Sequence, residues 1–167
     1  MPANVYHFVS RWRVAATIED VSTILGEAED LPRWWPSVYL RVEMLEPGDA
    51  HGIGRVVRLH TRGRLPYILT WTFRVVEARP PHGYAIEAFG DFVGCGVWTF
   101  TQDGTWADIT YDWQIRAEKP LLKWLSPVLK PLFAWNHRWA MARGEESLRR
   151  ELQRLHVLKR LARSVSR

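Results

Sequence analysis

The sequence is poor in the residues that build most covalent and metal-dependent sites. It has a single cysteine, Cys95, among 167 residues. One cysteine excludes an internal disulfide and favours a reducing compartment. The six histidines are dispersed, and no two of them have the spacing of a metal site: His7, His51, His60, His82, His137 and His156. We therefore expect no metal ion and no organic cofactor.

The usual catalytic motifs are also missing. There is no Cys-x-x-Cys pair, no His-Glu-x-x-His helix and no Gly-x-Ser-x-Gly turn. The two glycine-rich stretches, 51–55 (HGIGR) and 93–97 (VGCGV), are typical of turns or bulges at strand ends, not of a phosphate-binding loop. No residue can be assigned a catalytic role from such motifs.

Long apolar runs are absent too. No stretch of 18 apolar residues occurs, so we expect no transmembrane helix. The first twelve residues lack the charged-then-apolar order of a signal peptide. Together with the lone cysteine, these features predict a cytoplasmic protein.

Aromatic residues, in contrast, are abundant. Ten tryptophans occur in a chain that is 47% hydrophobic and 25% charged. This composition and length predict one globular domain spanning residues 1–167. Tryptophan suits large apolar surfaces that also need one polar group, as a core or the wall of a ligand site does.

Positive charge gathers at the end of the chain. The net charge is +5, and residues 138–167 hold eight Arg and one Lys against three Glu. The basic tail, about 156–167, fits either the solvated face of a helix or peripheral contact with an anionic membrane. Nucleic-acid binding is not expected, because the basic residues are not interleaved with exposed aromatics on a sheet.

The hydrophobic pattern predicts a strand, two short helices, six more strands and a long helix. Apolar residues alternate over 6–14, 38–45, 54–61, 66–78, 84–89, 93–101 and 106–115, as in strands with one buried face. Thr17 can cap a short helix that ends at Gly26, and a second short helix is expected over 30–35. Short turns between the strands imply an antiparallel meander.

The last helix is expected from about Pro131 to Leu161, because apolar residues recur there every three or four positions. The preceding segment, 118–131, contains three prolines and is predicted to be an apolar lead-in with a helical turn or two. Gly144 lies in the middle of the apolar stripe, where a helix favours alanine by up to about 1 kcal/mol. It either allows close approach of the helix to the layer beneath or is simply tolerated.

These elements resemble the polyketide cyclase/dehydrase group of the START-like (SRPBCC) superfamily. The resemblance rests on segments spread over nearly the whole chain: 12–16 (WRVAA), 31–38 (LPRWWPSV), 52–59 (GIGRVVRL), 70–81 (TWTFRVVEARPP), 90–100 (GDFVGCGVWTF), 109–113 (ITYDW) and 135–152. It implies an α+β helix-grip fold, in which a curved antiparallel sheet of about seven strands wraps a long C-terminal helix, with two short helices after the first strand. It also implies a hollow for an apolar molecule between sheet and helix.

Alternation and helical spacing indicate which residues face that hollow. Aromatics on one concave face form either a solid core or a ligand wall, and small neighbours such as Ala88 and Gly96 favour a cavity. Asn136 and His137 fall near the inward stripe, where a polar side chain needs a protein partner or a ligand. The expected ligand-binding residues are Trp35, Tyr67, Trp71, Trp98, Tyr111, Trp113, Asn136, His137, Ala140 and Met141.

Two functions remain open at this point. The first is binding or transport of a hydrophobic small molecule, lipid-like or polyketide-like, in this cavity. The alternative is a polyketide cyclase or dehydratase that acts without a metal or organic cofactor. The alternative needs at least two convergent ionisable groups, such as His137 with Tyr111 or Tyr67. The oligomeric state is not indicated.

Overall fold

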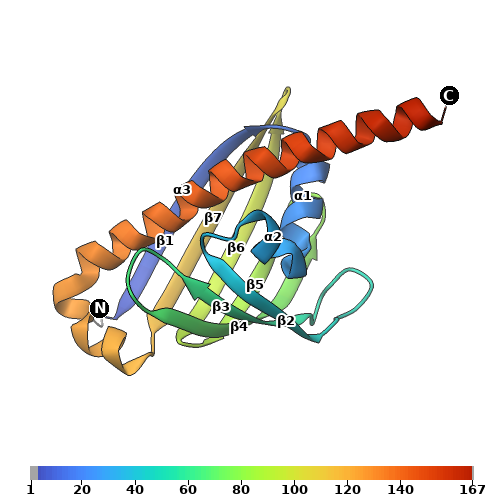
Figure 1. The fold of residues 1–167 in the computed structure, drawn as a ribbon. Coiled ribbons are helices and arrows are strands. Elements are labelled where there is room, and N and C mark those ends of the chain that lie inside the picture. The colour runs from blue at the N-terminus through green and yellow to red at the C-terminus, as the bar shows by residue number, and fades with distance from the viewer. Residues whose placement is uncertain (1–3, 167) are drawn as a thin grey trace.

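The protein, described here by a computed structural model of residues 4–166, is one curved sheet with a long helix lying across its concave face (Figure 1). The elements in chain order are β1 (Val5–Ala15), α1 (Ile18–Gly26), the 3-10 turn η1 (Ala28–Asp30), α2 (Leu31–Trp34), β2 (Tyr39–Glu46), β3 (Val56–Arg62), β4 (Ile68–Arg79), β5 (Gly83–Gly90), β6 (Phe92–Asp103), β7 (Trp106–Ala117) and α3 (Pro120–Val165).

The seven strands form one antiparallel sheet in the order β1-β7-β6-β5-β4-β3-β2. Consecutive strands from β2 to β7 are neighbours, and β1 closes the order by pairing with β7. Along β3 the alternation is plain, since Val57 and Leu59 are buried whereas Arg58 is exposed. This arrangement confirms the predicted helix-grip class.

The two short helices follow β1 as predicted. The hydroxyl of Thr17 accepts a hydrogen bond from the backbone N–H of Asp20 (3.2 Å), which caps α1. The expected second helix is divided into the turn η1 and a single helical turn, α2, which brings Trp34 and Trp35 into the core.

Helix α3 is longer than the sequence indicated. The segment 118–131 was expected to be a lead-in, but α3 begins at Pro120 and continues through Pro127 and Pro131. Each proline removes one backbone hydrogen bond, and the helix bends in this region (Figure 1). The helix nevertheless continues through both prolines. Of the helices within residues 4–166, none is long and apolar enough to cross a membrane.

Gly144 is buried and lies against a ring. A methyl group at this position would overlap the six-membered ring of Trp35, which is only 2% exposed. Helix α3 therefore approaches a neighbouring element closely at Gly144, as predicted. That element is the end of α2, at Trp35, and not the sheet. Met141, Leu148 and Leu152 extend the same buried stripe.

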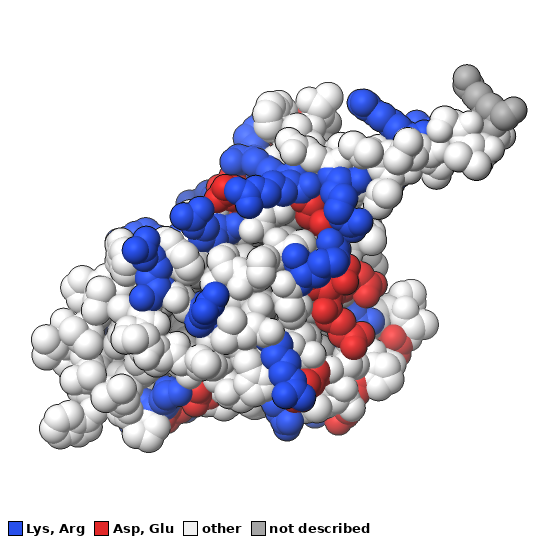
Figure 2. Space-filling view, in the orientation of Figure 1, with Lys and Arg blue, Asp and Glu red and all other residues white. Residues whose placement is uncertain are grey.

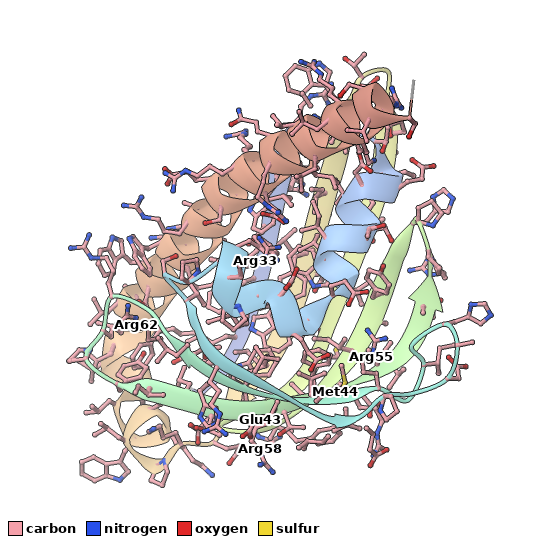
Figure 3. The ribbon with its side chains drawn as sticks, turned by 45° about the vertical axis from the view of Figure 1, so that its right-hand side comes forward. Arg33, Glu43, Met44, Arg55, Arg58 and Arg62 are labelled. Atoms are coloured by element: carbon pink, nitrogen blue, oxygen red, sulfur yellow. The ribbon has the colours of Figure 1, made fainter. Side chains whose placement is uncertain are left out.

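An ion-pair network fixes α2 to α3 beside this contact. Arg33 donates two hydrogen bonds to the carboxylate of Glu151 (2.6 and 2.9 Å), and Arg154 donates two more (2.8 and 3.0 Å). These bonds, from Arg33 first and then Arg154, lower the pKa of Glu151 to about 2. Figure 3 shows Arg33 between the two helices.

Substitution of Gly144 tests the helix contact. Gly144→Leu should lower the free energy of unfolding by about 1 to 3 kcal/mol, because the larger side chain must displace the Trp35 ring. Ala142→Leu places the same side chain on the exposed face of α3 and should change stability little. Urea unfolding of both variants measures this, and equal stability of the two would show that Gly144 is not needed for packing.

Candidate functional site

A cavity of about 130 Å³ lies between the sheet and the first half of α3. Nine of the ten residues expected at the ligand site line it. They are Trp35, Tyr67, Trp71, Tyr111, Trp113, Asn136, His137, Ala140 and Met141. The strand residues come from β4 and β7, where alternation directs them inward, and the helix residues from the face of α3 that covers the sheet.

Trp98, the tenth, lines a second hollow of about 90 Å³ instead. Its indole stacks on the ring of Tyr111, with 4.1 Å between ring centroids. Trp35, Tyr39, Trp71 and Tyr111 border both hollows, so these four side chains form the partition between them. Trp98 shares the inward face with the other aromatics but lies on the far side of the partition.

Aromatic rings form an almost unbroken chain across the concave face. Trp35 contacts Trp12 edge-on at 5.6 Å, and Trp12 contacts Trp98 at 5.5 Å. From Tyr111 the chain continues through Trp113 at 5.5 Å to Trp71 at 5.4 Å. Because the rings hold one another in place, their neighbours cannot fill the gaps between them, and the wall is preformed. Because the wall consists largely of rings, it is also apolar.

Asn136 belongs to the rim of the cavity. Its side-chain oxygen accepts a hydrogen bond from the backbone N–H of Arg64 (2.7 Å) in the loop between β3 and β4. Its amide lies so close to Gly63 that a side chain at that position would overlap it. Asn136 therefore joins the loop to α3, so its side-chain oxygen has a protein partner, one of the two possibilities that the sequence left open.

His137 lies on the wall of the cavity formed by β1 and α3. Its ring stacks on Phe8 with 4.2 Å between centroids, and its Nε2 is 3.4 Å from the hydroxyl of Ser10. Burial, with a smaller contribution from the nearby positive charge of Arg138, lowers the pKa of His137 to about 4. The imidazole is therefore neutral at physiological pH.

Three tyrosines supply the remaining polar groups of the cavity. Burial raises the pKa of Tyr39 and of Tyr111 well above the ordinary range and that of Tyr67 to about 12, so all three phenols stay protonated. Within residues 4–166 their hydroxyls have no side-chain hydrogen-bond partner. Each can donate a hydrogen bond to an uncharged oxygen on a ligand.

Two other polar groups of the wall, Tyr6 and Thr61, are paired within the chain, whereas the exposed Arg62 also lines the cavity and carries a positive charge. The hydroxyl of Tyr6 donates to Ser126 (2.6 Å), which donates to the carbonyl of Leu122 (2.5 Å). Thr61 accepts a hydrogen bond from the indole N–H of Trp71 (3.2 Å). Within residues 4–166, no three His, Cys, Asp or Glu side chains are close enough to share a metal ion.

The sequence analysis did not identify 13 of the 22 residues that line the cavity. The additional lining residues are Tyr6, Phe8, Val38, Tyr39, Thr61, Arg62, Gly63, Leu69, Phe92, Ile115, Ala117, Leu122 and Phe133. Tyr6 and Phe8 could have been found from the alternation along β1. Tyr39 could not, because irregular pairing with β3 next to it interrupts the alternation of β2.

The buried imidazole predicts a specific loss of stability in acid. Because the pKa of His137 is about 4 in the folded chain and about 6.5 in the unfolded chain, the unfolded chain binds more protons between these values. Stability should therefore be complete above pH 6.5 and fall as the pH decreases towards 4. His137→Phe should remove this slope, whereas Glu151 acts only below its ordinary pKa of about 4.5.

Urea unfolding across this pH range provides the measurement. His51→Gln, at an exposed histidine, is the control and should keep the slope of the wild type. An unchanged slope in His137→Phe would contradict a neutral, buried imidazole.

Comparison with known proteins agrees with this geometry. The family model described as polyketide cyclase / dehydrase and lipid transport matches residues 6–153. A comparison with curated protein sequences found no match.

Three solved structures are similar in fold. A START superfamily protein from Mycobacterium smegmatis has a TM-score of 0.70 at 14% identity, covering 89% of this chain and 98% of that one. The Zhui aromatase/cyclase from a Streptomyces species has a TM-score of 0.66 at 22% identity, covering 90% and 94%. A norcoclaurine synthase mutant from Thalictrum flavum, in complex with a transition-state analogue, has a TM-score of 0.61 at 16% identity, covering 91% and 96%.

The family match spans most of the chain and coincides with the sheet, the two short helices and the part of α3 that bounds the cavity. It confirms the resemblance to the START-like superfamily. The chain therefore belongs to the polyketide cyclase/dehydrase and lipid transport family.

Proposed function

We propose that this protein binds and carries a neutral hydrophobic small molecule, lipid-like or polyketide-like, between its sheet and α3. The observation that carries the proposal is a preformed cavity walled by aromatic and aliphatic side chains. Its buried titratable groups, His137 and the three phenols, are uncharged at neutral pH. The one charged side chain among the lining residues, Arg62, is exposed, so a charged ligand held deeper in the cavity would lose its hydration without a partner of opposite charge.

The dimensions limit the ligand further. A cavity of about 150 Å³ accommodates a molecule of the size of benzene, which is close to the volume of the main hollow. A longer or polycyclic ligand must occupy both hollows, which requires the shared side chains of Trp35, Tyr39, Trp71 and Tyr111 to rotate.

The alternative function is that of a cyclase or dehydratase acting on a polyketone chain. The three unpaired phenols and the imidazole of His137 favour it, because they border one cavity and could orient carbonyl oxygens. The similarity in fold to an aromatase/cyclase also supports it. Against it stands the pKa of His137, since a general base works best when its pKa is near the working pH.

Peripheral contact of the basic tail with an anionic membrane remains a prediction. Within the tail Lys159 bonds Asp20 (2.5 Å), and just before it Arg154 bonds Glu151. Arg160 and Arg163 lie beyond these pairs, near the end of α3. The attraction to anionic lipid is therefore smaller than the count of basic residues suggests.

Filling the cavity tests the binding function. Ala140→Leu places a larger side chain in the wall and should weaken binding of the neutral probe N-phenyl-naphthylamine by roughly tenfold or more. Ala142→Leu, on the exposed face of the same helix, should leave the affinity unchanged. Titration followed by quenching of tryptophan emission provides the affinity. Equal affinity in both variants would contradict binding in this cavity.

Turnover distinguishes the alternative function. If the protein is a cyclase, Tyr67→Phe and Tyr111→Phe should each lower kcat for a polyketone substrate by about tenfold or more while the probe still binds. A carrier should release the same polyketone chemically unchanged, as detected by mass spectrometry. Product formation in the wild type that both variants retain would contradict a catalytic role for these phenols.

A further inference from the structure

The outer side of the first turns of α3 carries a continuous apolar stripe. Its members recur at steps of three or four residues and are exposed by 57%, 86%, 79%, 38% and 41%: Leu121, Trp124, Val128, Leu132 and Trp135. This spacing places them on one helical face. We call these five residues the outer apolar face.

Packing of the domain does not account for this face. The same helical turns already bury Leu122 and Ser126 against the sheet and direct Phe133 and His137 into the cavity wall. A single exposed apolar residue is ordinary, but a contiguous exposed stripe indicates an interaction surface. Inner and outer faces of one helical segment thus serve different contacts.

The surrounding charge identifies the partner. Residues 119–144 contain no Asp or Glu, but they contain Lys119, Lys123, Lys130, Arg138 and Arg143. In Figure 2 the end of the molecule that holds the start of α3 is almost entirely white, with scattered blue.

Two nearby arginines extend the positive rim. The guanidinium of Arg64 lies over the ring of Trp135, 5.9 Å from its centroid. Figure 3 shows Arg62 at the end of β3, close to α3, where it also lines the cavity. Two of the lysines also contact acids of neighbouring loops, since Lys119 is 3.6 Å from Asp91 and Lys123 is 3.4 Å from Glu118. Arg143 pairs with Glu146 (2.9 Å), and Lys130, Arg138 and Arg64 keep the rim positive.

We propose that the outer apolar face docks on an anionic lipid bilayer. Exposed tryptophan and leucine with flanking lysine and arginine are the composition of helices that lie in a membrane interface. The bend at Pro127 and Pro131 makes this segment an end of the molecule, so it can meet a flat surface (Figure 1). Docking there places the cavity wall formed by Leu122 and Phe133 directly above the lipid.

The far end of α3 is a poorer candidate, although Leu161 and Val165 are exposed by 58% and 87%. Its approach is lined by Glu145, Glu146 and Glu151, which pair with arginines of the same helix. The two ends of one helix expose similar apolar side chains but differ in the acidic residues beside them. The far end therefore supplies a matched control.

Cosedimentation of the full chain with vesicles tests the docking site. The wild type should bind vesicles that mix phosphatidylcholine with phosphatidylglycerol more tightly than phosphatidylcholine alone, and added salt should weaken binding. Trp124→Glu with Val128→Glu should weaken partitioning by at least about tenfold. Leu161→Glu with Val165→Glu should bind as the wild type does.

The vesicle experiment is accompanied by controls for folding and for self-association. Unchanged far-ultraviolet circular dichroism and probe binding would show that the glutamate variants still fold, and Trp124→Ala with Val128→Ala provides a milder second pair. The proposal would be overturned if the two double-glutamate variants lost vesicle binding equally. It would also be overturned if the wild type bound equally to vesicles with and without phosphatidylglycerol. A wild-type dimer that does not bind vesicles and dissociates in Trp124→Glu would overturn it too, because the face would then be an interface between two copies.

Discussion

The contact between Gly144 and Trp35 determines how the rest of the domain is arranged. Only a residue without a side chain lets α3 approach the indole this closely, and the indole is almost fully buried there. The contact sets the height of α3 above the sheet. The paired bonds of Arg33 and Arg154 to Glu151 then hold α2 and α3 together next to it. Because one aromatic ring lies under the helix, the helix cannot close fully on the strands.

The cavity is the consequence of that spacing. Toward the start of α3, the rings of Trp71, Tyr111 and Trp113 line the sheet, and His137 and Met141 line the helix. Large rigid rings on one side and small or slender side chains on the other leave space that rotamer changes cannot close without strain. The same burial that forms the hollow keeps its imidazole and phenols uncharged. Geometry and electrostatics therefore both support the proposed binding of a neutral apolar molecule.

The position of α3 also explains the asymmetry of its two ends. Its middle is fixed by the buried stripe of Met141, Leu148 and Leu152, and its C-terminal end extends past the sheet (Figure 1). The first turns, bent by two prolines, close the cavity on one side and expose apolar side chains on the other. Near the end of the buried stripe, Arg149 and Arg154 pair with glutamates of the same helix, and Arg160 and Arg163 follow nearer the end of α3. A single helix can thus bound a ligand site and present a surface to a partner.

Much of the fold and of the site followed from local patterns. Alternation along β4 and β7 identified Trp71, Tyr111 and Trp113 as inward-facing, because side chains in a strand point to opposite faces in turn. Helical spacing likewise assigned His137 and Met141 to the covered face of α3. Where the pattern was broken, prediction failed: irregular pairing in β2 concealed Tyr39.

The sequence by itself determined the order of the strands and helices along the chain and which faces of these elements point inward. It also determined that α3 meets another element at Gly144. These depend on residue period and on backbone freedom, which are local properties. Only the tertiary structure decided that Trp98 lies beyond the partition, that Asn136 binds the loop at Arg64, and that α3 continues through its prolines. Each of these depends on contacts between segments distant in the chain. Packing against the sheet can hold a proline-containing helix together where local preference alone would end it.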